Sequence, residues 1–186
     1  MTKKQIILSL IILFLLSFLV SFIITKYITY QKERLLEVAD SVIDCELNIE
    51  LITENELEKN ENIIGKLIIP KINLEAPIQE GTSQKVLRFA IGHFEESSFF
   101  DGNVALAAHN RGNITNYFAD VKNLTFGDEI IYKTRMGERR YKVCEIKEIE
   151  ETDWSVIFNS EENMVTLITC INNKPEYRLC VQGIEK

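Results

Sequence analysis

The sequence lacks the residue patterns that would tie its cysteines and histidines to a metal ion. None of its four cysteines forms a C-x-x-C pair, and His93 and His109 lie far along the chain from any cysteine. Structural zinc sites need such ligands at short, regular spacings. We therefore expect no metal and no other cofactor. Cys144 and Cys180 are expected to be small core residues, although an even number of cysteines also permits disulfides.

Clusters of positive charge are also missing. The chain has 21 Lys and Arg against 28 Asp and Glu, which gives a net charge of −7. Beyond Arg135, Arg139 and Arg140, around a predicted turn, Lys and Arg are scattered. Because nucleic acid binding relies on cations that neutralise phosphates, this composition argues against a nucleic acid partner.

One long segment, residues 6–25, has no charged residue and only Ser and Thr as polar residues. Twenty helical residues are about 30 Å long, the thickness of a bilayer core. The segment ends without an A-x-A-like cleavage site, so it is predicted to be an uncleaved signal anchor in the lipid bilayer. Lysines flank it on both sides, which leaves its orientation open by charge alone. Because the tail at residues 1–5 is short, we expect it in the cytoplasm and the rest of the chain on the extracellular side.

An apolar stripe follows the anchor. Its members recur at alternating spacings of three and four, at Leu35, Val38, Val42, Cys45, Ile49 and Ile52. This spacing predicts a juxtamembrane helical linker within residues 26–62. We expect the stripe to pack on the following domain or in a short coiled coil; the alternative is an appendage that covers an active site.

Residues 63–186 form one predicted β domain. Short apolar and β-branched runs are separated by turn residues, at 63–69, 72–76, 103–109, 129–133, 140–147, 166–170 and 178–184. Helical patterns are limited to 84–89 and a stretch around 117–123. Many short strands with few helices predict a barrel or a sandwich.

Three reactive residues fall at strand ends: His109 ends one strand, Cys170 ends another, and Arg178 begins the strand after a loop. Cys170 and Arg178 are therefore expected at one edge of the sheet. His109 reaches that edge if its strand runs parallel to that of Cys170. A thiolate can attack a carbonyl, an imidazole can transfer protons, and a guanidinium can stabilise an oxyanion. Taken singly, each residue also has an ordinary structural explanation, and spacing alone leaves both interpretations open.

The residues around Cys170 resemble a family signature. Thr166-Leu-Ile-Thr-Cys is similar to the TLxTC motif of the sortases, cysteine transpeptidases of Gram-positive cell surfaces. The resemblance extends over roughly residues 63–186 and includes Gly65–Leu74, Gly92-His-Phe, Gly102–Asn110 and Gly127-Asp-Glu-Ile. One difference is that Ala108 and Asn110 flank His109, where many members have Gly and Arg.

The resemblance implies a mostly β fold, a closed eight-stranded barrel with one or two short helices, preceded by a transmembrane helix. It implies that Cys170 attacks the Thr–Gly bond of an LPxTG-like sorting signal and forms a thioacyl-enzyme. His109 would be the general acid and base, and Arg178 would position the signal and stabilise the oxyanion. The implied partners are surface proteins with a C-terminal sorting signal and a peptidoglycan amine acceptor.

Four further residues are weaker candidates for substrate binding: Thr169, His93, Trp154 and Asn110. By the resemblance, Thr169 donates into the oxyanion site, unless it is there only for its β propensity. His93 is structural, close to the substrate, or a reserve acid. Trp154 is a groove wall or a core anchor. Asn110 orients the His109 ring or only starts a turn.

The subclass and two alternative functions remain open in the sequence. The compact domain, the TLxTC form and the absence of a DPF or DPW lid motif most resemble class D sortases, with class A next. One alternative is a membrane-anchored cysteine protease that hydrolyses its acyl-enzyme. The other is a non-catalytic surface module that binds wall or protein ligands.

Overall fold

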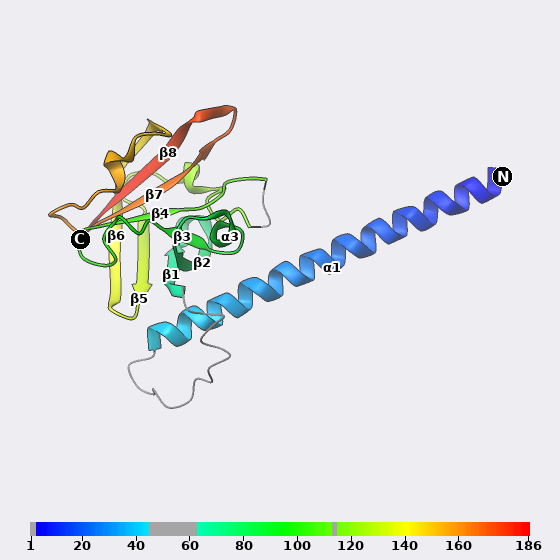
Figure 1. Cartoon of the computed structure of the whole chain (residues 1–186), viewed down its shortest axis with the longest axis horizontal. Coiled ribbons are helices and arrows are strands. Elements are labelled where there is room, and N and C mark those ends of the chain that lie inside the picture. The colour runs from blue at the N-terminus through cyan, green and yellow to red at the C-terminus, as the bar shows by residue number, and fades with distance from the viewer. Residues whose placement is uncertain (1–2, 45–62, 113–114) are drawn as a thin grey trace.

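A computed structural model describes residues 3–44, 63–112 and 115–186 of the chain. A long N-terminal helix, α1 (Lys3–Asp44), precedes a β-barrel (Figure 1). The strands are β1 (Ile63–Ile69), β2 (Leu74–Glu80), β3 (Ile91–His93), β4 (Asn103–Ala107), β5 (Glu129–Thr134), β6 (Gly137–Glu150), β7 (Met164–Ile171) and β8 (Lys174–Glu185). The short helices are α3 (Gln84–Leu87) and the 3₁₀ turns η1 (Pro70–Ile72), η2 (Val121–Asn123) and η3 (Trp154–Ile157).

The strands of residues 63–112 and 115–186 close into an eight-stranded barrel in the order β1-β2-β3-β4-β7-β8-β6-β5. The predicted closed barrel is therefore confirmed. Most neighbours are antiparallel, but β2 pairs with β3 and β4 pairs with β7 in parallel. The β4–β7 pair matters for the site, because it sends the ends of two distant segments to the same rim.

The barrel core follows from alternation along the strands. On β1, every second side chain is buried, and Leu67 and Ile69 are completely enclosed. Tyr132 and Tyr141 from β5 and β6 are also fully buried in the same cluster. Each such large side chain contributes about 2–3 kcal/mol by leaving water. This single core fixes the barrel on which the rim residues are mounted.

Several strand boundaries differ from the prediction: β6, β7 and β8 are longer than expected, and β3 was not expected. The strand expected at 72–76 starts at Leu74, because Pro70 begins a 3₁₀ turn that the Asn73 N–H closes on the Pro70 carbonyl (3.1 Å). The strand expected to end at His109 ends at Ala107. Proline fixes its own φ and donates no ladder hydrogen bond, which explains the late start of β2.

Helix α1 runs without a break from the predicted anchor into the predicted linker. Residues 3–44 contain neither glycine nor proline, the residues that most readily interrupt a helix. The stretch Leu10–Ile43 is long and apolar enough to cross a membrane, and apolar side chains such as Leu13, Phe14 and Phe18 are exposed. An isolated helix with such a surface is consistent with a transmembrane anchor.

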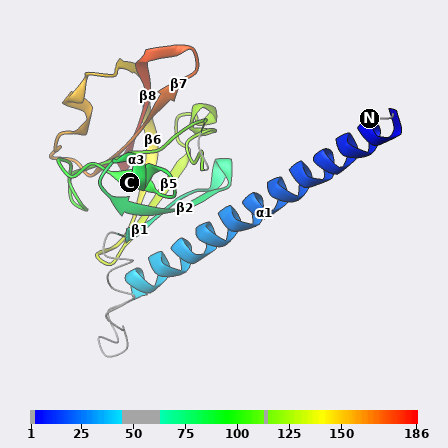
Figure 2. The same ribbon diagram turned by 45° about the vertical axis from the view of Figure 1, so that its right-hand side comes forward.

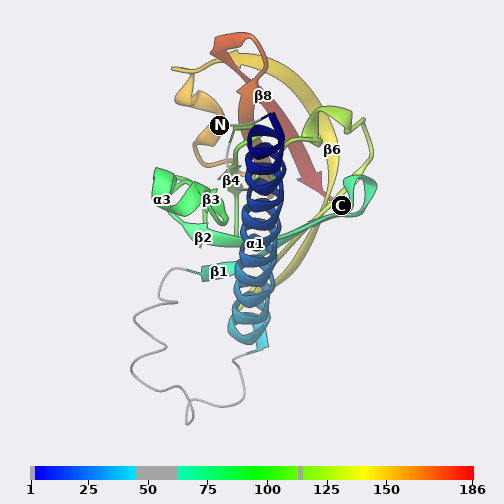
Figure 3. The ribbon, with the colours of Figure 1, turned by 90° about the vertical axis from the view of Figure 1, so that its right-hand side faces the viewer.

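The C-terminal part of α1 packs on the outside of the barrel, against β1, β2 and β5. Ala39 is completely buried there, and the Lys66 ammonium pairs with Asp40 of α1 and with Glu75 of β2 (3.1 Å). Figures 2 and 3 show α1 running beside β1 and β2 while its N-terminal half extends away from the barrel. The described end of α1, which carries Leu35, Val38 and Val42 of the predicted stripe, thus lies against the domain; Cys45, Ile49 and Ile52 lie outside the described residues.

Candidate active site

The β7–β8 hairpin places Cys170 directly opposite Arg178, since the two residues are cross-strand partners. The predicted loop between them is much shorter than expected. The two strands turn through Asn172 and Asn173 alone, and Asn173 adopts a left-handed conformation (φ 62°) that asparagine tolerates. Arg178 therefore lies inside β8 and does not begin it. A register shift between Cys170 and Ile171 absorbs the extra residues of β8.

The parallel β4–β7 pair brings His109 to the same rim, as the sequence analysis required. Beyond Ala107, the Ala108 N–H donates to the Ile168 carbonyl (3.4 Å). The Thr169 hydroxyl donates to the Ala108 carbonyl (2.8 Å), and the Asn110 side-chain amide donates to the Cys170 carbonyl. The segment that carries His109 is thus joined by hydrogen bonds to the segment that carries Cys170.

The three reactive residues at this rim line one open cavity of about 490 Å³. Its walls include Cys170, His109 and Arg178, together with Thr169 and Trp154. No described residue of α1 belongs to its lining, so among residues 3–44 the helix does not cover the site. The cavity is large enough for several residues of an extended peptide and leaves the thiol accessible.

The His109 ring is half-buried, and its Nε2 atom is buried without a hydrogen-bond partner. An unpaired buried polar atom costs about 1–3 kcal/mol, so its presence calls for an explanation. In a cavity that also contains a thiol, a substrate group is the partner that would satisfy this nitrogen. The position suits proton transfer to or from a bound amine.

Arg178 is held firmly by protein groups. Its Nη1 atom donates to the carbonyls of Pro175 (2.6 Å) and Tyr177 (2.9 Å), and its Nη2 atom donates to Glu151 Oε2 (2.7 Å). Glu151 also lines the cavity. Because a guanidinium has five N–H donors, these three bonds fix its plane and leave donors for a substrate.

Replacing Glu151 with glutamine is expected to lower kcat/KM for a donor peptide about two- to fivefold, because a partly exposed ion pair contributes little. Steady-state kinetics on the full chain measure this effect. Glu150→Gln, which removes a neighbouring carboxylate from the same cavity, is the matched control. An increase in activity in Glu151→Gln would mean that Glu151 restrains Arg178 and does not position it.

Trp154 forms a wall of the cavity and is not a core anchor. It lies on η3, between β6 and β7, and 54% of its surface is exposed. Its indole packs edge-to-face on Phe94, with ring centroids 6.2 Å apart. The next residues, Val156 and Ile157, are buried and hold the turn on the barrel.

A buried residue missed by the sequence analysis, Asn103, fixes this wall. Its side-chain amide donates to the carbonyls of Val156 (2.8 Å) and Phe158 (3.0 Å), and its oxygen accepts from the Thr166 hydroxyl (2.7 Å). The available signal was a polar residue at the start of the otherwise apolar run Val104 to Ala108. Because buried polar groups need hydrogen-bond partners, this position could have been predicted to bond to another segment of the chain.

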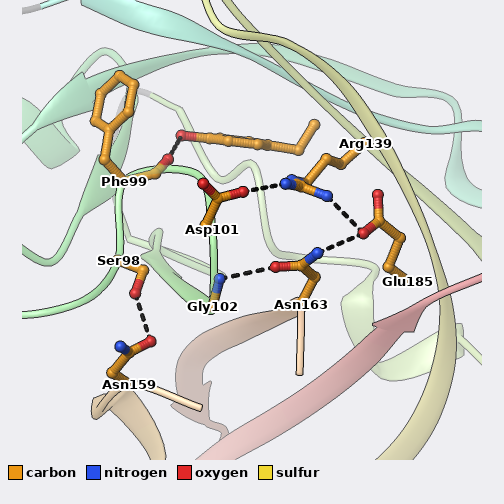
Figure 4. A network of polar contacts seen from close by, with 9 residues as sticks. Ser98, Phe99, Asp101, Gly102, Arg139, Asn159, Asn163 and Glu185 are labelled. Atoms are coloured by element: carbon orange, nitrogen blue, oxygen red, sulfur yellow. Dashed lines mark hydrogen bonds and ion pairs between the residues drawn. The ribbon is translucent and has the colours of Figure 1, made fainter. Parts of the chain in front are cut away.

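The connection between β6 and β7, which carries η3, is held at its C-terminal end by a network of polar contacts (Figure 4). Ser98 donates to Asn159 (2.7 Å), and the Gly102 N–H donates to Asn163 (2.9 Å). Asn163 and Arg139 both donate to Glu185 Oε2, at 2.7 and 2.5 Å. The network ties the connection between β6 and β7 to the segment before β4 and to the end of β8.

Glu185 makes this network sensitive to acid. Burial by itself raises the pKa of Glu185, but the hydrogen bonds from Arg139 and Asn163 outweigh it and hold the pKa below its usual range. A depressed folded-state pKa adds stability above the unfolded pKa of about 4.3, and this stability is lost as the pH falls through the folded value.

Glu185→Gln is therefore expected to be less stable than the native chain at pH 7, by about 1 kcal/mol, with the difference shrinking below about pH 4.3. Unfolding followed by the β-sheet circular dichroism signal measures this difference. Glu176→Gln, which removes an exposed carboxylate of the same strand, is the control. A difference that stays constant with pH would contradict the assignment.

His93 does not line the cavity. Its ring is buried, with Nδ1 2.7 Å from Glu80 Oε1 and Nε2 3.1 Å from the Ser98 carbonyl. Ser97 Oγ lies 3.2 Å from the same Nε2 atom. These contacts give His93 a structural environment beneath the segment that carries Ser98.

Cys144, Cys170 and Cys180 are free thiols, and Cys45 lies outside the described residues. The expectation that Cys180 is a core residue is confirmed, and burial raises its pKa to about 12. The expectation for Cys144 is wrong, because a register shift between Val143 and Glu145 leaves this residue exposed. Within the described ranges, no cluster of three or more His, Cys, Asp or Glu side chains forms a candidate metal site.

The fold and the cavity thus define a β-barrel protein with a cysteine, a histidine and an arginine at one rim. The sortase domain family model matches residues 67–185. The chain belongs to the sortase family, whose members are cysteine transpeptidases.

Similar proteins include members of two sortase classes. The chain is 30% identical over 146 residues to sortase A of Bacillus anthracis, covering 78% of this chain and 69% of that protein. It is 33% identical over 109 residues to sortase D of Bacillus subtilis, covering 57% and 53%. The solved structure of a Clostridium perfringens sortase D5 transpeptidase is 28% identical, with a TM-score of 0.68 over 84% of this chain and 99% of that one. The chain thus spans about half to two thirds of the curated relatives.

Proposed function

We propose that this chain is a membrane-anchored sortase that cleaves an LPxTG-like sorting signal between Thr and Gly and transfers the protein to an amino group of the cell wall. The observation that carries the proposal is one cavity lined by Cys170, His109 and Arg178 in a barrel of this family. Residues 6–25 are the bilayer anchor in this proposal, and the barrel lies on the extracellular side.

The mechanism follows from the three side chains. The Cys170 thiolate attacks the threonine carbonyl, and the carbon–sulfur bond forms as the carbonyl becomes an oxyanion. Free N–H donors of Arg178 stabilise that oxyanion or hold the signal backbone. The C–N bond then breaks, and the glycine nitrogen leaves with a proton from His109. In the second half, an acceptor amine attacks the thioester, loses a proton to His109, and releases the Cys170 thiolate.

The proposed subclass is class D, with class A as the alternative. The match to the C. perfringens sortase D5 structure covers almost the whole length of that protein, which favours class D. The B. anthracis sortase A match keeps class A open. The lack of a DPF or DPW motif in the sequence agrees with either and disfavours class C.

The test uses the full chain in detergent micelles, a panel of LPxTG-type peptides, and an added amine. A transpeptidase gives a peptide ligated to the amine, and its hydrolysis product decreases as the amine concentration rises. Hydrolysis that the amine does not change would establish a cysteine protease instead. Binding of the peptides without any cleavage would establish a non-catalytic module.

A further inference from the structure

The docking of α1 fixes how far the barrel lies from the predicted bilayer anchor. The side chains of α1 are all exposed from Leu10 to Tyr27. From Ile28 to Ile43, side chains at a helical spacing are partly or fully buried, and this part of the helix packs on β1, β2 and β5. The barrel therefore begins to lie alongside α1 just beyond the apolar segment at 6–25.

The rim that carries Cys170 is the one that points toward the anchor. The opposite rim lies at the C-terminal end of α1, because Ile43 and the β5–β6 hairpin line one hollow. From that end, β1 runs beside α1 in the direction of the anchor and leads into η1 (Figure 2). Strands β4 and β7 run in the same sense as β1, and β5 runs against it. The rim of Cys170 therefore also carries η1, the β7–β8 turn and the connection from η2 to β5.

The distance from this rim to the lipid headgroups is short. Lys66, in the middle of β1, pairs with Asp40, and Ile69 lies about 10 Å further along the strand. About seven helical residues cover the same length, so the end of β1 is level with the region of Glu33. From Glu33 to Lys26, the first charged residue after the apolar segment, is again about 10 Å. The headgroup layer outside the hydrocarbon core fills about 5–8 Å of that span.

The turns on this rim that lie next to β1 and β5 carry an exposed aromatic ring and two lysines. Phe126, between η2 and β5, is 71% exposed, and Lys71 on η1 and Lys122 on η2 are exposed as well. The Thr125 N–H and hydroxyl donate to Asp128 (2.8 and 3.0 Å), and with the charge of Lys71 they hold the pKa of this carboxyl below its usual range. Lys71 therefore lies beside the turn that carries Phe126.

We propose that the rim around Cys170 faces the bilayer and contacts it through these turns, with Phe126 among the lipid headgroups and Lys71 and Lys122 on their phosphates. Aromatic rings favour the membrane interface, and lysines near the surface attract anionic lipids. The inference rests on the anchor of the proposed function and adds a second lipid contact, which orients the barrel. Cys170 then opens toward the membrane, so a donor reaches it along the membrane surface.

Fluorescence quenching by labelled lipids tests this contact in the full chain. Trp154 is the only tryptophan of the chain, so it is first replaced with phenylalanine, and each variant then receives one new tryptophan. In vesicles of phosphatidylcholine and phosphatidylglycerol, Phe126→Trp is expected to lose about half of its emission to a nitroxide on the lipid headgroup. Met136→Trp, an exposed position on the opposite rim, is expected to lose almost none. Equal quenching at both positions would overturn the inference.

The role of the two lysines has its own measurement. Lys71→Gln combined with Lys122→Gln is expected to raise the phosphatidylglycerol fraction needed for half-maximal quenching of Phe126→Trp about fivefold, because each lysine is attracted to the anionic surface. Lys133→Gln combined with Arg135→Gln removes the same charge from the opposite rim and is expected to leave that fraction unchanged. An equal shift in both combinations would mean that only the net charge of the barrel matters, and the lysines would lose their assigned role.

A tryptophan in the anchor separates the failure of this contact from the failure of the proposed anchor. Phe14→Trp is expected to be quenched by a nitroxide in the middle of the lipid chains, because residue 14 lies near the centre of the apolar segment. Quenching of Phe14→Trp without quenching of Phe126→Trp would leave the anchor in place and overturn the contact. Absence of quenching in both variants would overturn the anchor as well.

Discussion

Replacing Cys170 with alanine is expected to abolish peptide transfer, with a loss in kcat of about 10⁴-fold or more. No other described thiol can take over. Cys180 is enclosed in the barrel wall with a pKa raised by burial, and Cys144 lies on β6 and does not line the cavity that contains Cys170. The measurement is the rate of amine-dependent transfer by the full chain.

Cys144→Ala is the matched control for this substitution. It removes an exposed thiol from the same barrel and is expected to keep nearly full activity. Retention of transfer in Cys170→Ala, with Cys144→Ala inactive, would move the nucleophile to β6 and contradict the account of the site.

Replacing His109 with glutamine is expected to lower kcat by about 10²- to 10⁴-fold, the usual contribution of a positioned acid and base. Glutamine keeps much of the size and polarity of the ring but transfers no proton. The loss should fall mainly on kcat, because the peptide still binds in the cavity beside Arg178. Single-turnover kinetics with a peptide donor separate this chemical step from binding.

His93→Gln is the control, since it alters the one other histidine. His93 is buried among Glu80, Ser97 and Ser98 and does not line the cavity. Its replacement is expected to reduce stability by about 1–3 kcal/mol and to leave the folded fraction active. A folded but inactive His93 variant, with His109→Gln active, would assign the acid role to His93.

Local patterns predicted a barrel or a sandwich and placed Cys170 and Arg178 at one edge of the sheet, whereas the closed eight-stranded barrel was implied by the family resemblance. Short alternating runs define strands, and Val165 to Cys170 is nearly continuous in apolar and β-branched residues. The parallel β4–β7 pair is different. It joins residues about sixty positions apart, a separation that leaves no local pattern, so it entered the prediction only as the condition under which His109 reaches the rim.

Details that depend on tertiary contacts could not be predicted. Pro175, five residues after Cys170, suggested a loop. In the structure β7 and β8 pair on both sides of Pro175, and the register shift between Cys170 and Ile171 accommodates the proline. Glu151 contacts Arg178 from the turn after β6, and Asn103 bonds to a carbonyl of η3. Such contacts follow from the closure of the barrel and leave no periodic signal in the chain.

The docking of α1 gives the barrel a defined attachment. The helix runs from the apolar segment to the outer face of β1, β2 and β5, with no glycine or proline at which to bend. The turn of the β7–β8 hairpin lies at the other end of the barrel from the C-terminal end of α1 (Figures 1 and 2). Accordingly, no described residue of α1 lines the cavity that contains Cys170.

The most direct test of the central claim is intact-mass spectrometry of the full chain after brief incubation with an LPxTG-type peptide in the absence of amine. The account predicts an adduct equal to the peptide up to its threonine, located on Cys170, absent from Cys170→Ala, and discharged when an amine is added. Cleavage of the peptide without any adduct on Cys170, or with an adduct on another residue, would contradict it.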